Sequence, residues 1–372
     1  MPKRVLFLIE SLAGGGAEKV LATLVQHIDI SRFDVTVCTI SGGGRYEQEV
    51  RNAVNYTSVL KDASEYRGLA KLWYVLKYKL IYQWLPMWLV YRLFIPKGYD
   101  VEIAFVEGLA TKLLAHSSNK NAKKISWVHI DLQQKPWPLE QGIYRNFEEE
   151  KSSYRSYDRV VCVSKSVEAV MRDYYRLDTT QTIYNPLDAR QILSMGDEKD
   201  DWSINPECFN IVSVGRLMPQ KGYDQLLPVI TRLLTDKRRI HLWLIGQGGE
   251  EVSLRQQAKE QGISDHVTFT GFLKNPYALM SKMDLFVCSS RAEGFSLVIA
   301  ESMILGVPVI SMNCSGPNEL IGKNEYGILC DTYEQLEEEI TAAIDGKKIP
   351  CSIPPMVDLQ HTMNEVHHLL DS

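Results

Sequence analysis

Residues 284–306 read DLFVCSSRAEGFSLVIAESMILG, and this stretch decides the fold. Its first five residues are Asp284 and a short apolar run, which predict a buried strand. Ser296 to Leu305 then predict a helix that ends at Gly306. A buried strand that leads through a short loop into an apolar helix is typical of parallel sheets covered by helices on both faces.

Two acids flank the start of this helix. Glu293 falls on the strand-to-helix loop, and Glu301 lies about a turn and a half into the helix. The backbone N–H groups of Phe295, Ser296 and Leu297 are expected to be unpaired donors that can meet a phosphate. Acids near a helix start often serve only as caps, and acids within a helix usually face solvent. Because Glu301 lies among apolar residues, it needs a partner or a ligand, and a nucleotide sugar fits both acids.

Strand-like apolar runs recur along the chain with helical patterns between them. In the first half they are Val5–Ile9, Val35–Ile40, Val101–Phe105, Lys124–Val128 and Val160–Val163. In the second half they are Asn210–Val214, His241–Ile245, Val267–Thr270, Leu285–Cys288 and Val307–Ile310. This double series predicts an α/β protein with two Rossmann-like, doubly wound parallel-sheet domains that face one another across a cleft.

The length of 372 residues exceeds that of one ordinary core. The strand pattern lapses into a polar, charged stretch shortly after Asn185-Pro186. We therefore expect a first domain over residues 1–187 and a second over residues 188–352. The apolar residues of 353–372 share one helical face, so this tail is expected to pack back on the body.

Composition narrows the class of protein. With 45% hydrophobic and 23% charged residues the chain has an ordinary globular composition, and its net charge of -5 argues against nucleic-acid binding. The seven scattered cysteines lack the spacing of zinc or dithiol sites, which favours the reducing cytoplasm. The apolar run at the N-terminus is short and ends at Glu10, so it predicts a strand and not an export signal.

Residues 66–99 depart from the α/β pattern. They combine tryptophan, tyrosine and leucine with several lysines and arginines, and their longest uncharged run is broken by Pro86. That run is shorter than the roughly 20 residues that cross a bilayer. Two interpretations stay open: a helix that lies in the lipid headgroup layer, and a helix pair packed on the first sheet.

Glycines and cations follow two of the predicted strands. Gly14-Gly15-Gly16 lies between the first strand and a helix, where backbone amides can approach an anion. The run lacks the third spaced glycine of a dinucleotide site, which disfavours a nicotinamide enzyme. In the second half, Gly215-Arg216 follows a strand and Lys221 comes five residues later; these two cations can neutralise a diphosphate, although a solvated surface pair is the alternative.

Three further strand ends contribute candidates. Gly246 and Leu273 follow two strands of the second half and could line a base pocket, unless their loops are ordinary turns. His129 ends a first-half strand and is expected to face the same cleft. No cluster has metal-ligand spacing, and no Asp-x-Asp follows a strand, so no metal is expected.

Together these motifs resemble the family 4 retaining glycosyltransferases of GT-B fold. The resemblance covers most of the chain and is most specific in the order and spacing of the C-terminal motifs. It implies that Arg216 and Lys221 bind the donor diphosphate and that His129 contacts the donor sugar. It implies contacts from Glu293 to sugar hydroxyls and from Glu301 to the ribose. The predicted donor-binding backbone comprises Gly15, Gly16, Gly215, Gly246, Leu273, Gly294, Phe295, Ser296 and Leu297.

The implied activity is transfer of a hexose, with retention of configuration and without a metal, from a nucleotide-diphosphate sugar to a glycan or lipid-linked sugar. UDP is favoured as the donor nucleotide. His129, Arg216, Lys221 and Glu293 are the predicted catalytic residues. The expected location is the cytoplasm, and peripheral attachment to an anionic inner membrane surface stays open. The alternatives are a nucleotide-sugar epimerase of the same fold and a non-catalytic membrane-associated scaffold.

Overall fold

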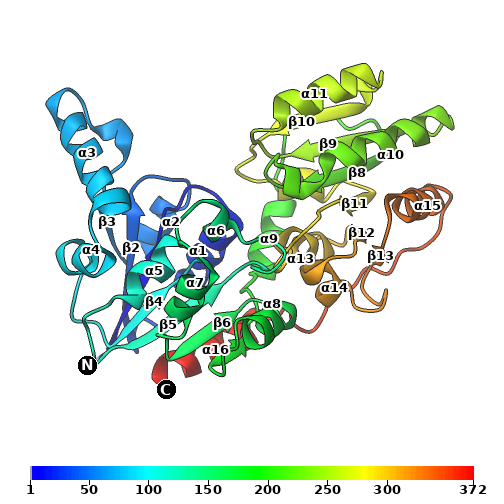
Figure 1. The fold of residues 1–372 in the computed structure, drawn as a ribbon. Helices are drawn as coiled ribbons and strands as arrows, with labels where there is room; N and C mark the ends of the chain where they lie inside the picture. Colours follow the sequence, from blue (N-terminus) through cyan, green and yellow to red (C-terminus); the bar gives the residue numbers. More distant parts are fainter. Residues whose placement is uncertain (1) are drawn as a thin grey trace. The chain divides into compact units, whose positions relative to one another are not determined.

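The computed structural model describes residues 2–372 and divides the chain into two compact units. Unit 1 comprises Met1–Pro186 and Asp358–Ser372, and unit 2 comprises Leu187–Val357. Each unit is a parallel sheet with helices on its faces (Figure 1). None of the helices in residues 2–372 is both long enough and apolar enough to cross a bilayer.

The sheet of unit 1 has seven parallel strands in the order β3-β2-β1-β4-β5-β6-β7. The strands are β1 (Lys3–Ile9), β2 (Phe33–Ser41), β3 (Asn55–Leu60), β4 (Val101–Ala104), β5 (Lys123–Val128), β6 (Arg159–Cys162) and β7 (Thr180–Thr182). Successive strands extend the sheet one way from β1 and then the other way from β4. The order therefore reverses between β1 and β4, where open α/β sheets bind ligands.

The helices of unit 1 follow the strands in turn. They are α1 (Gly16–His27), α2 (Glu47–Ala53), α3 (Leu69–Lys79), α4 (Met87–Phe94), α5 (Leu109–Ala115), α6 (Trp137–Glu140), α7 (Phe147–Tyr154), α8 (Lys165–Ala169) and α16 (Leu359–Asp371). The last helix, α16, buries Met363, Val366 and Leu370. The ammonium groups of Lys3 and Lys123 donate to the carbonyls of its final turn, which secures the end of the chain on unit 1.

Unit 2 has six parallel strands in the order β10-β9-β8-β11-β12-β13. The strands are β8 (Phe209–Val214), β9 (Ile240–Ile245), β10 (Val267–Gly271), β11 (Leu285–Cys288), β12 (Val309–Met312) and β13 (Ile328–Cys330). The helices are α9 (Ala189–Gly196), α10 (Tyr223–Thr235), α11 (Glu251–Glu260), α12 (Tyr277–Met280), α13 (Leu297–Ile304), α14 (Ser315–Ile321) and α15 (Tyr333–Ile344). Here the order reverses between β8 and β11.

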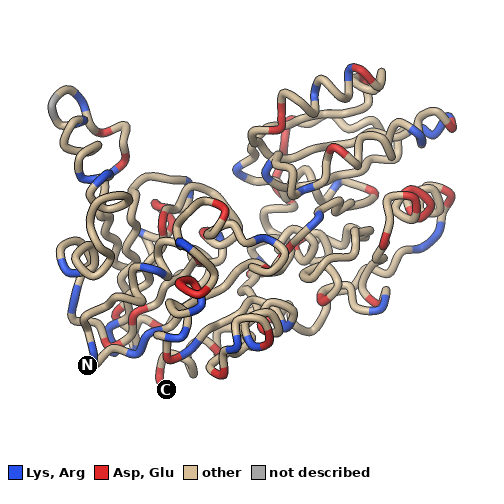
Figure 2. The backbone as a smooth tube through the Cα atoms, in the orientation of Figure 1, with Lys and Arg blue, Asp and Glu red and all other residues tan. Residues whose placement is uncertain are grey.

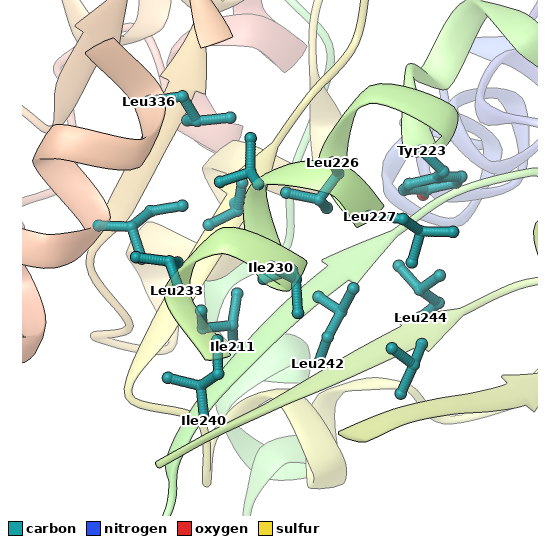
Figure 3. Close-up of a cluster of buried hydrophobic side chains, with 14 of the residues drawn as sticks. Ile211, Tyr223, Leu226, Leu227, Ile230, Leu233, Ile240, Leu242, Leu244 and Leu336 are labelled. Carbon is teal, nitrogen blue, oxygen red and sulfur yellow. The ribbon is translucent and has the colours of Figure 1, made fainter. Parts of the chain in front are cut away.

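The core of unit 2 explains why these segments form a sheet with helices on it. Figure 3 shows Leu226, Ile230 and Leu233 of α10 directed toward Leu242 and Ile211 of the central strands. All five side chains are at most 1% exposed, so each adds on the order of 1.5–3 kcal/mol of burial free energy. This packing fixes the position of the loops that leave β8 and β11.

Each strand predicted from the sequence has a counterpart in the structure. The last is displaced: β12 spans Val309–Met312, where the sequence predicted Val307–Ile310. Pro308 precedes the observed strand and has no N–H for the sheet, although its carbonyl accepts from Phe286. The strands β3, β7 and β13 were not predicted, because edge strands are short or polar and need not be apolar on both faces.

Candidate functional site

The loops after β8 and β11 meet at the point where the strand order of unit 2 reverses. Lys221 ends a short 3₁₀ turn (Pro219–Lys221) between β8 and α10, and Glu293 lies between β11 and α13. The Lys221 ammonium donates to Glu293 Oε1 across 2.6 Å, and the Ser290 hydroxyl donates to the same oxygen across 2.7 Å. Both charged side chains are mostly buried, with 19% and 12% of their surface exposed. The sheet therefore joins a cation and an acid that are 72 positions apart in the sequence.

Three hydrogen bonds to backbone carbonyls hold these two loops together. The Arg291 N–H donates to the Gln220 carbonyl at 2.8 Å, and the Gln220 side-chain amide donates to the Ala292 carbonyl at 2.7 Å. The Ser289 hydroxyl donates to the carbonyl of Lys221 at 2.8 Å. The ion pair is thus supported by a frame of its own loops, which fixes its geometry before any ligand binds.

Two glycines allow the loops to approach so closely. Gly222 has a left-handed φ of 67°, and a Cβ there would lie 2.1 Å from the Ser289 carbonyl oxygen. Gly246, after β9, has φ 141°, and a Cβ there would lie 2.0 Å from the Gly215 carbonyl oxygen. Any larger residue at either position would force the backbone apart. Gly215 and Gly246 are therefore neighbours, so the loops after β8 and β9 lie side by side.

The two cations of this edge differ in their surroundings. Burial by itself lowers the pKa of Lys221, but the charge of Glu293 outweighs it, so the pKa lies above its ordinary value and the ammonium stays charged at neutral pH. Arg216 is exposed on the loop after β8, and its guanidinium makes no hydrogen bond or ion pair within residues 2–372. It is thus available to an anionic ligand.

Helix α13 begins after Ser296, one residue later than predicted, and Glu301 is its fifth residue with 2% of its surface exposed. The Leu297 N–H donates to the Phe295 carbonyl at 3.1 Å, because the chain turns tightly into the helix. The prediction that this N–H is an unpaired donor is therefore wrong. The buried Ser296 hydroxyl has no hydrogen-bond partner in the described part of the chain.

In unit 1 the glycine run lies where the sequence predicted it. Gly15 precedes the first residue of α1, Gly16, directly after the loop that leaves β1. Gly294 of unit 2 lies against helix α14. A Cβ on Gly316 of that helix would be 3.0 Å from the carbonyl carbon of Gly294. Leu273 is half-buried just after β10. The roles of all these residues toward a donor stay predictions.

His129 follows β5, and its ring is bonded to the loop after β4. Its Nε2 lies 2.9 Å from the Phe105 carbonyl oxygen, which can only accept, so Nε2 carries the proton. Burial lowers the pKa of His129 to about 4, and the ring is therefore neutral at pH 7. Its remaining nitrogen, Nδ1, is consequently a hydrogen-bond acceptor.

Glu107, which sequence reasoning missed, holds the backbone of this histidine. Its Oε1 accepts the N–H of His129 and, at 3.0 Å, that of Ile130. Only 2% of Glu107 is exposed, and burial raises its pKa to about 7. Its place two residues after the predicted strand Val101–Phe105 was visible in the sequence, but its contact with the backbone of His129 was not.

A second buried acid lies in the same unit. Glu150 of α7 accepts from the Tyr175 hydroxyl at 2.9 Å through Oε2, while its Oε1 has no partner within residues 2–372. Burial raises its pKa also to about 7. No group of three or more His, Cys, Asp or Glu residues in the described chain is arranged to hold a metal ion.

Comparisons with known proteins cover both halves of the chain. Residues 14–191 match the family model described as Glycosyltransferase Family 4, and residues 195–353 match the one described as Glycosyl transferases group 1. The chain is 28% identical over 180 residues to the lipopolysaccharide core biosynthesis glycosyltransferase LpsE of Rhizobium meliloti. That match spans 48% of this chain and about half of LpsE, at 51%.

One further relative and one solved structure match over almost their whole length. An uncharacterised glycosyltransferase of Haemophilus influenzae is 25% identical over 343 residues, which are 91% of this chain and 89% of that protein. The structure of HepE from Anabaena, in complex with UDP and glucose, has a TM-score of 0.75 at 21% identity and covers 99% of both chains. This likeness shows that the two units form the two-domain GT-B fold.

Proposed function

We propose that this chain, which belongs to the glycosyltransferases of GT-B fold, moves a hexose from a nucleotide-diphosphate sugar to a glycan or lipid-linked sugar with retention of configuration. The observation that carries the proposal is the Lys221–Glu293 pair at the reversal point of the unit 2 sheet. A cation and a carboxylate side by side suit a ligand in which a diphosphate adjoins a sugar.

The cations supply the charge that departure of a diphosphate requires. Lys221 stays protonated, and Arg216 offers a forked donor that is not engaged in an ion pair within residues 2–372. Both are proposed to stabilise negative charge as the bond from the anomeric carbon to the phosphate breaks. With these two charges fixed in the protein, we propose that the transfer needs no metal ion.

Glu293 is proposed to accept hydrogen bonds from hydroxyl groups of the donor sugar, and Glu301 is proposed to accept them from hydroxyl groups of the ribose. Glu293 Oε1 already accepts from Lys221 and Ser290, which orients the carboxylate and leaves Oε2 for a ligand. His129 is proposed to accept a hydrogen bond from a donor-sugar hydroxyl at Nδ1, because its Nε2–H donates a hydrogen bond to the Phe105 carbonyl.

The proposed reaction is a front-side displacement. The acceptor hydroxyl attacks the anomeric carbon on the face from which the diphosphate leaves, and its proton passes to the departing phosphate oxygen. The protein contributes position and charge to an oxocarbenium-like state, and no side chain forms a covalent intermediate.

UDP is the proposed donor nucleotide, supported by its presence in the HepE structure. A glycoconjugate acceptor is supported by the lipopolysaccharide role in the printed name of LpsE. The seven free cysteines support a cytoplasmic location, and we place the acceptor at the inner membrane face.

A donor screen tests the proposal. UDP- and GDP-sugars are incubated with the protein, nucleotide release is measured, and the anomeric configuration of the product is read by NMR. Release from one UDP-hexose with a retained linkage is expected. An inverted product would overturn the retaining mechanism, a donor converted to its epimer would favour an epimerase, and absence of any thermal shift with nucleotides would favour a non-catalytic scaffold.

A further inference from the structure

We infer that residues 66–99, here termed the docking segment, bind the surface of an anionic phospholipid bilayer. The segment contains α3, the π-helical turn Leu80–Trp84 and α4. Its exposure, its charge and its attachment to unit 1 each contribute to the argument. The inference rests on the proposed function only for the view that the acceptor is held at the membrane.

The docking segment exposes large apolar side chains at an unusual density. Leu72 and Trp73 of α3 are 71% and 72% exposed, and Trp84, Trp88 and Leu93 are all more than half exposed. The segment also exposes Val75, Leu76 and Tyr78. Side chains of this kind gathered on one surface mark an interaction site, whereas single exposed apolar residues do not.

Helix α3 has little contact with the sheet that would otherwise account for its sequence. From residue 70 to residue 79 every side chain is exposed or half-buried, and Figure 1 shows α3 standing away from the sheet of unit 1. Leu72, Val75 and Leu76 lie three and four positions apart, so they share one face of the helix. The unpartnered face is therefore apolar.

Charge decides which partner covers this face. Residues 66–99 contain six Lys and Arg residues and no Asp or Glu, within a chain of net charge -5. Figure 2 shows the basic positions along α3 and α4. Lys79 lies over the Trp84 ring, 5.9 Å from its centroid, so cation and aromatic face are presented together. Basic residues beside tryptophan and leucine match the headgroup and acyl boundary of an anionic membrane.

The lengths of the helices indicate how the segment lies. Helix α3 has 11 residues and α4 has 8, about half of the roughly 20 that span the hydrocarbon core. Their exposed apolar side chains can therefore enter the interface while the helices stay on the surface. A second copy of the chain would instead bring two strongly basic segments together, which charge repulsion opposes.

The base of the docking segment is fixed to the edge of the sheet that carries the candidate site residues of unit 1. The Tyr82 hydroxyl donates to Glu10, just after β1, at 3.2 Å. The Lys77 ammonium donates at 2.6 Å to the Val59 carbonyl near the end of β3. Carboxyl ends of parallel strands share one edge, so the glycine loop after β1 and His129 after β5 lie on it too. A lipid-bearing acceptor could thus keep its tail in the bilayer while its sugar reaches these loops.

Vesicle sedimentation tests the inference. The full chain is mixed with vesicles of phosphatidylcholine alone or with about a third phosphatidylglycerol, at low and at high salt. The wild type is expected to sediment with the anionic vesicles at low salt and to be released at high salt. One surface lysine contributes about fivefold to binding, so the Lys71→Glu/Lys79→Glu variant should bind at least tenfold more weakly.

Matched variants separate the segment from general surface effects. Leu72→Gln/Trp73→Gln should lower binding by tenfold or more, whereas Ile30→Gln, at a site 69% exposed in the same unit, should stay within twofold. Lys120→Glu is the matched charge control. Failure of the wild type to bind anionic vesicles overturns the inference, as does equal loss in the controls or dimer formation through the segment without vesicle binding. Transfer to a short soluble acceptor by a protein that does not bind vesicles would leave the proposed function intact.

Discussion

In unit 2 the loops after β8 and β11 are joined by an ion pair, whereas in unit 1 the loops after β4 and β5 are joined by a buried carboxyl that accepts backbone N–H groups. Lys221 keeps its charge because Glu293 is beside it. Glu107 and His129 are both shifted toward their neutral forms by burial. Two sheets of the same topology class therefore present different chemistry: one edge suits anions, and the other suits hydroxyl groups.

Lys221→Ala removes the cation on which the contrast depends and should have the largest effect. Loss of one preorganised charge at a developing anion costs about 10²–10³ in turnover. The measurement is the rate of nucleotide release with saturating donor. Arg239→Ala breaks an exposed pair with Glu207 in the same unit and should change the rate less than threefold. Turnover of Lys221→Ala within a few-fold of wild type would contradict the proposed role.

Glu150→Gln sharpens the contrast from the side of unit 1. The pKa of Glu150 is about 7 when folded and near 4.5 when unfolded, so its contribution to stability is present below pH 4.5 and is lost as the pH rises through 7. Relative to that of wild type, the free energy of unfolding of the variant should rise by on the order of 3 kcal/mol between pH 4.5 and pH 8. Denaturant unfolding across this range measures the gain.

Glu148→Gln, which removes an exposed carboxylate from the same helix, is the control for this measurement. A stability difference between Glu150→Gln and wild type that does not change with pH would show that Glu150 is ionised in the folded protein.

Arg216→Ala tests the other cation, whose guanidinium has no hydrogen bond or ion pair within residues 2–372 to hold it in place. A charge-assisted contact to a diphosphate is worth about 10- to 100-fold in kcat/KM. Because the Arg216 side chain is exposed and makes no ion pair in the described chain, the thermal midpoint should be unchanged. Arg216→Lys should recover part of the activity. A variant that unfolds at lower temperature but retains kcat/KM would assign Arg216 a structural role.

His129 should give the smallest effect. One hydrogen bond from a neutral group is worth about tenfold in rate, so His129→Phe should slow transfer by about that factor. Nitrogen NMR of the labelled ring should show an unprotonated Nδ1 and a protonated Nε2 from pH 5 to 8, since the pKa is about 4. A ring protonated at Nδ1 would reverse the proposed direction of the hydrogen bond.

The sequence predicts the parts of the molecule that are buried on both sides. Central strands such as β4 and β11 are continuous apolar runs, and Glu293 was placed correctly between β11 and α13. The edge strand β7 is Thr-Gln-Thr, which has no apolar pattern to detect. Pattern reasoning therefore finds the centre of each sheet and misses the edge strands β3, β7 and β13, whereas the edge strand β10 was predicted.

The candidate site was predictable to the same extent. Lys221 and Glu293 were proposed as partners of one ligand because both follow strands, and the structure places them in contact. Glu107 could not be assigned, since its role depends on two backbone N–H groups of a neighbouring strand's loop. Hydrogen bonds from a side chain to a distant backbone leave no periodic signature in the sequence.

The discontinuous build of unit 1 affects the order in which the protein can form. Its last helix, α16, comes from residues 359–371, although the remainder of the unit ends at Pro186. On the ribosome, unit 2 emerges in one piece and can fold as soon as it is released, whereas unit 1 waits for a segment made more than 170 residues later. Until then Phe33 lacks the His367 ring that stacks on it at 5.7 Å. The half of the protein synthesised first is therefore the half completed last.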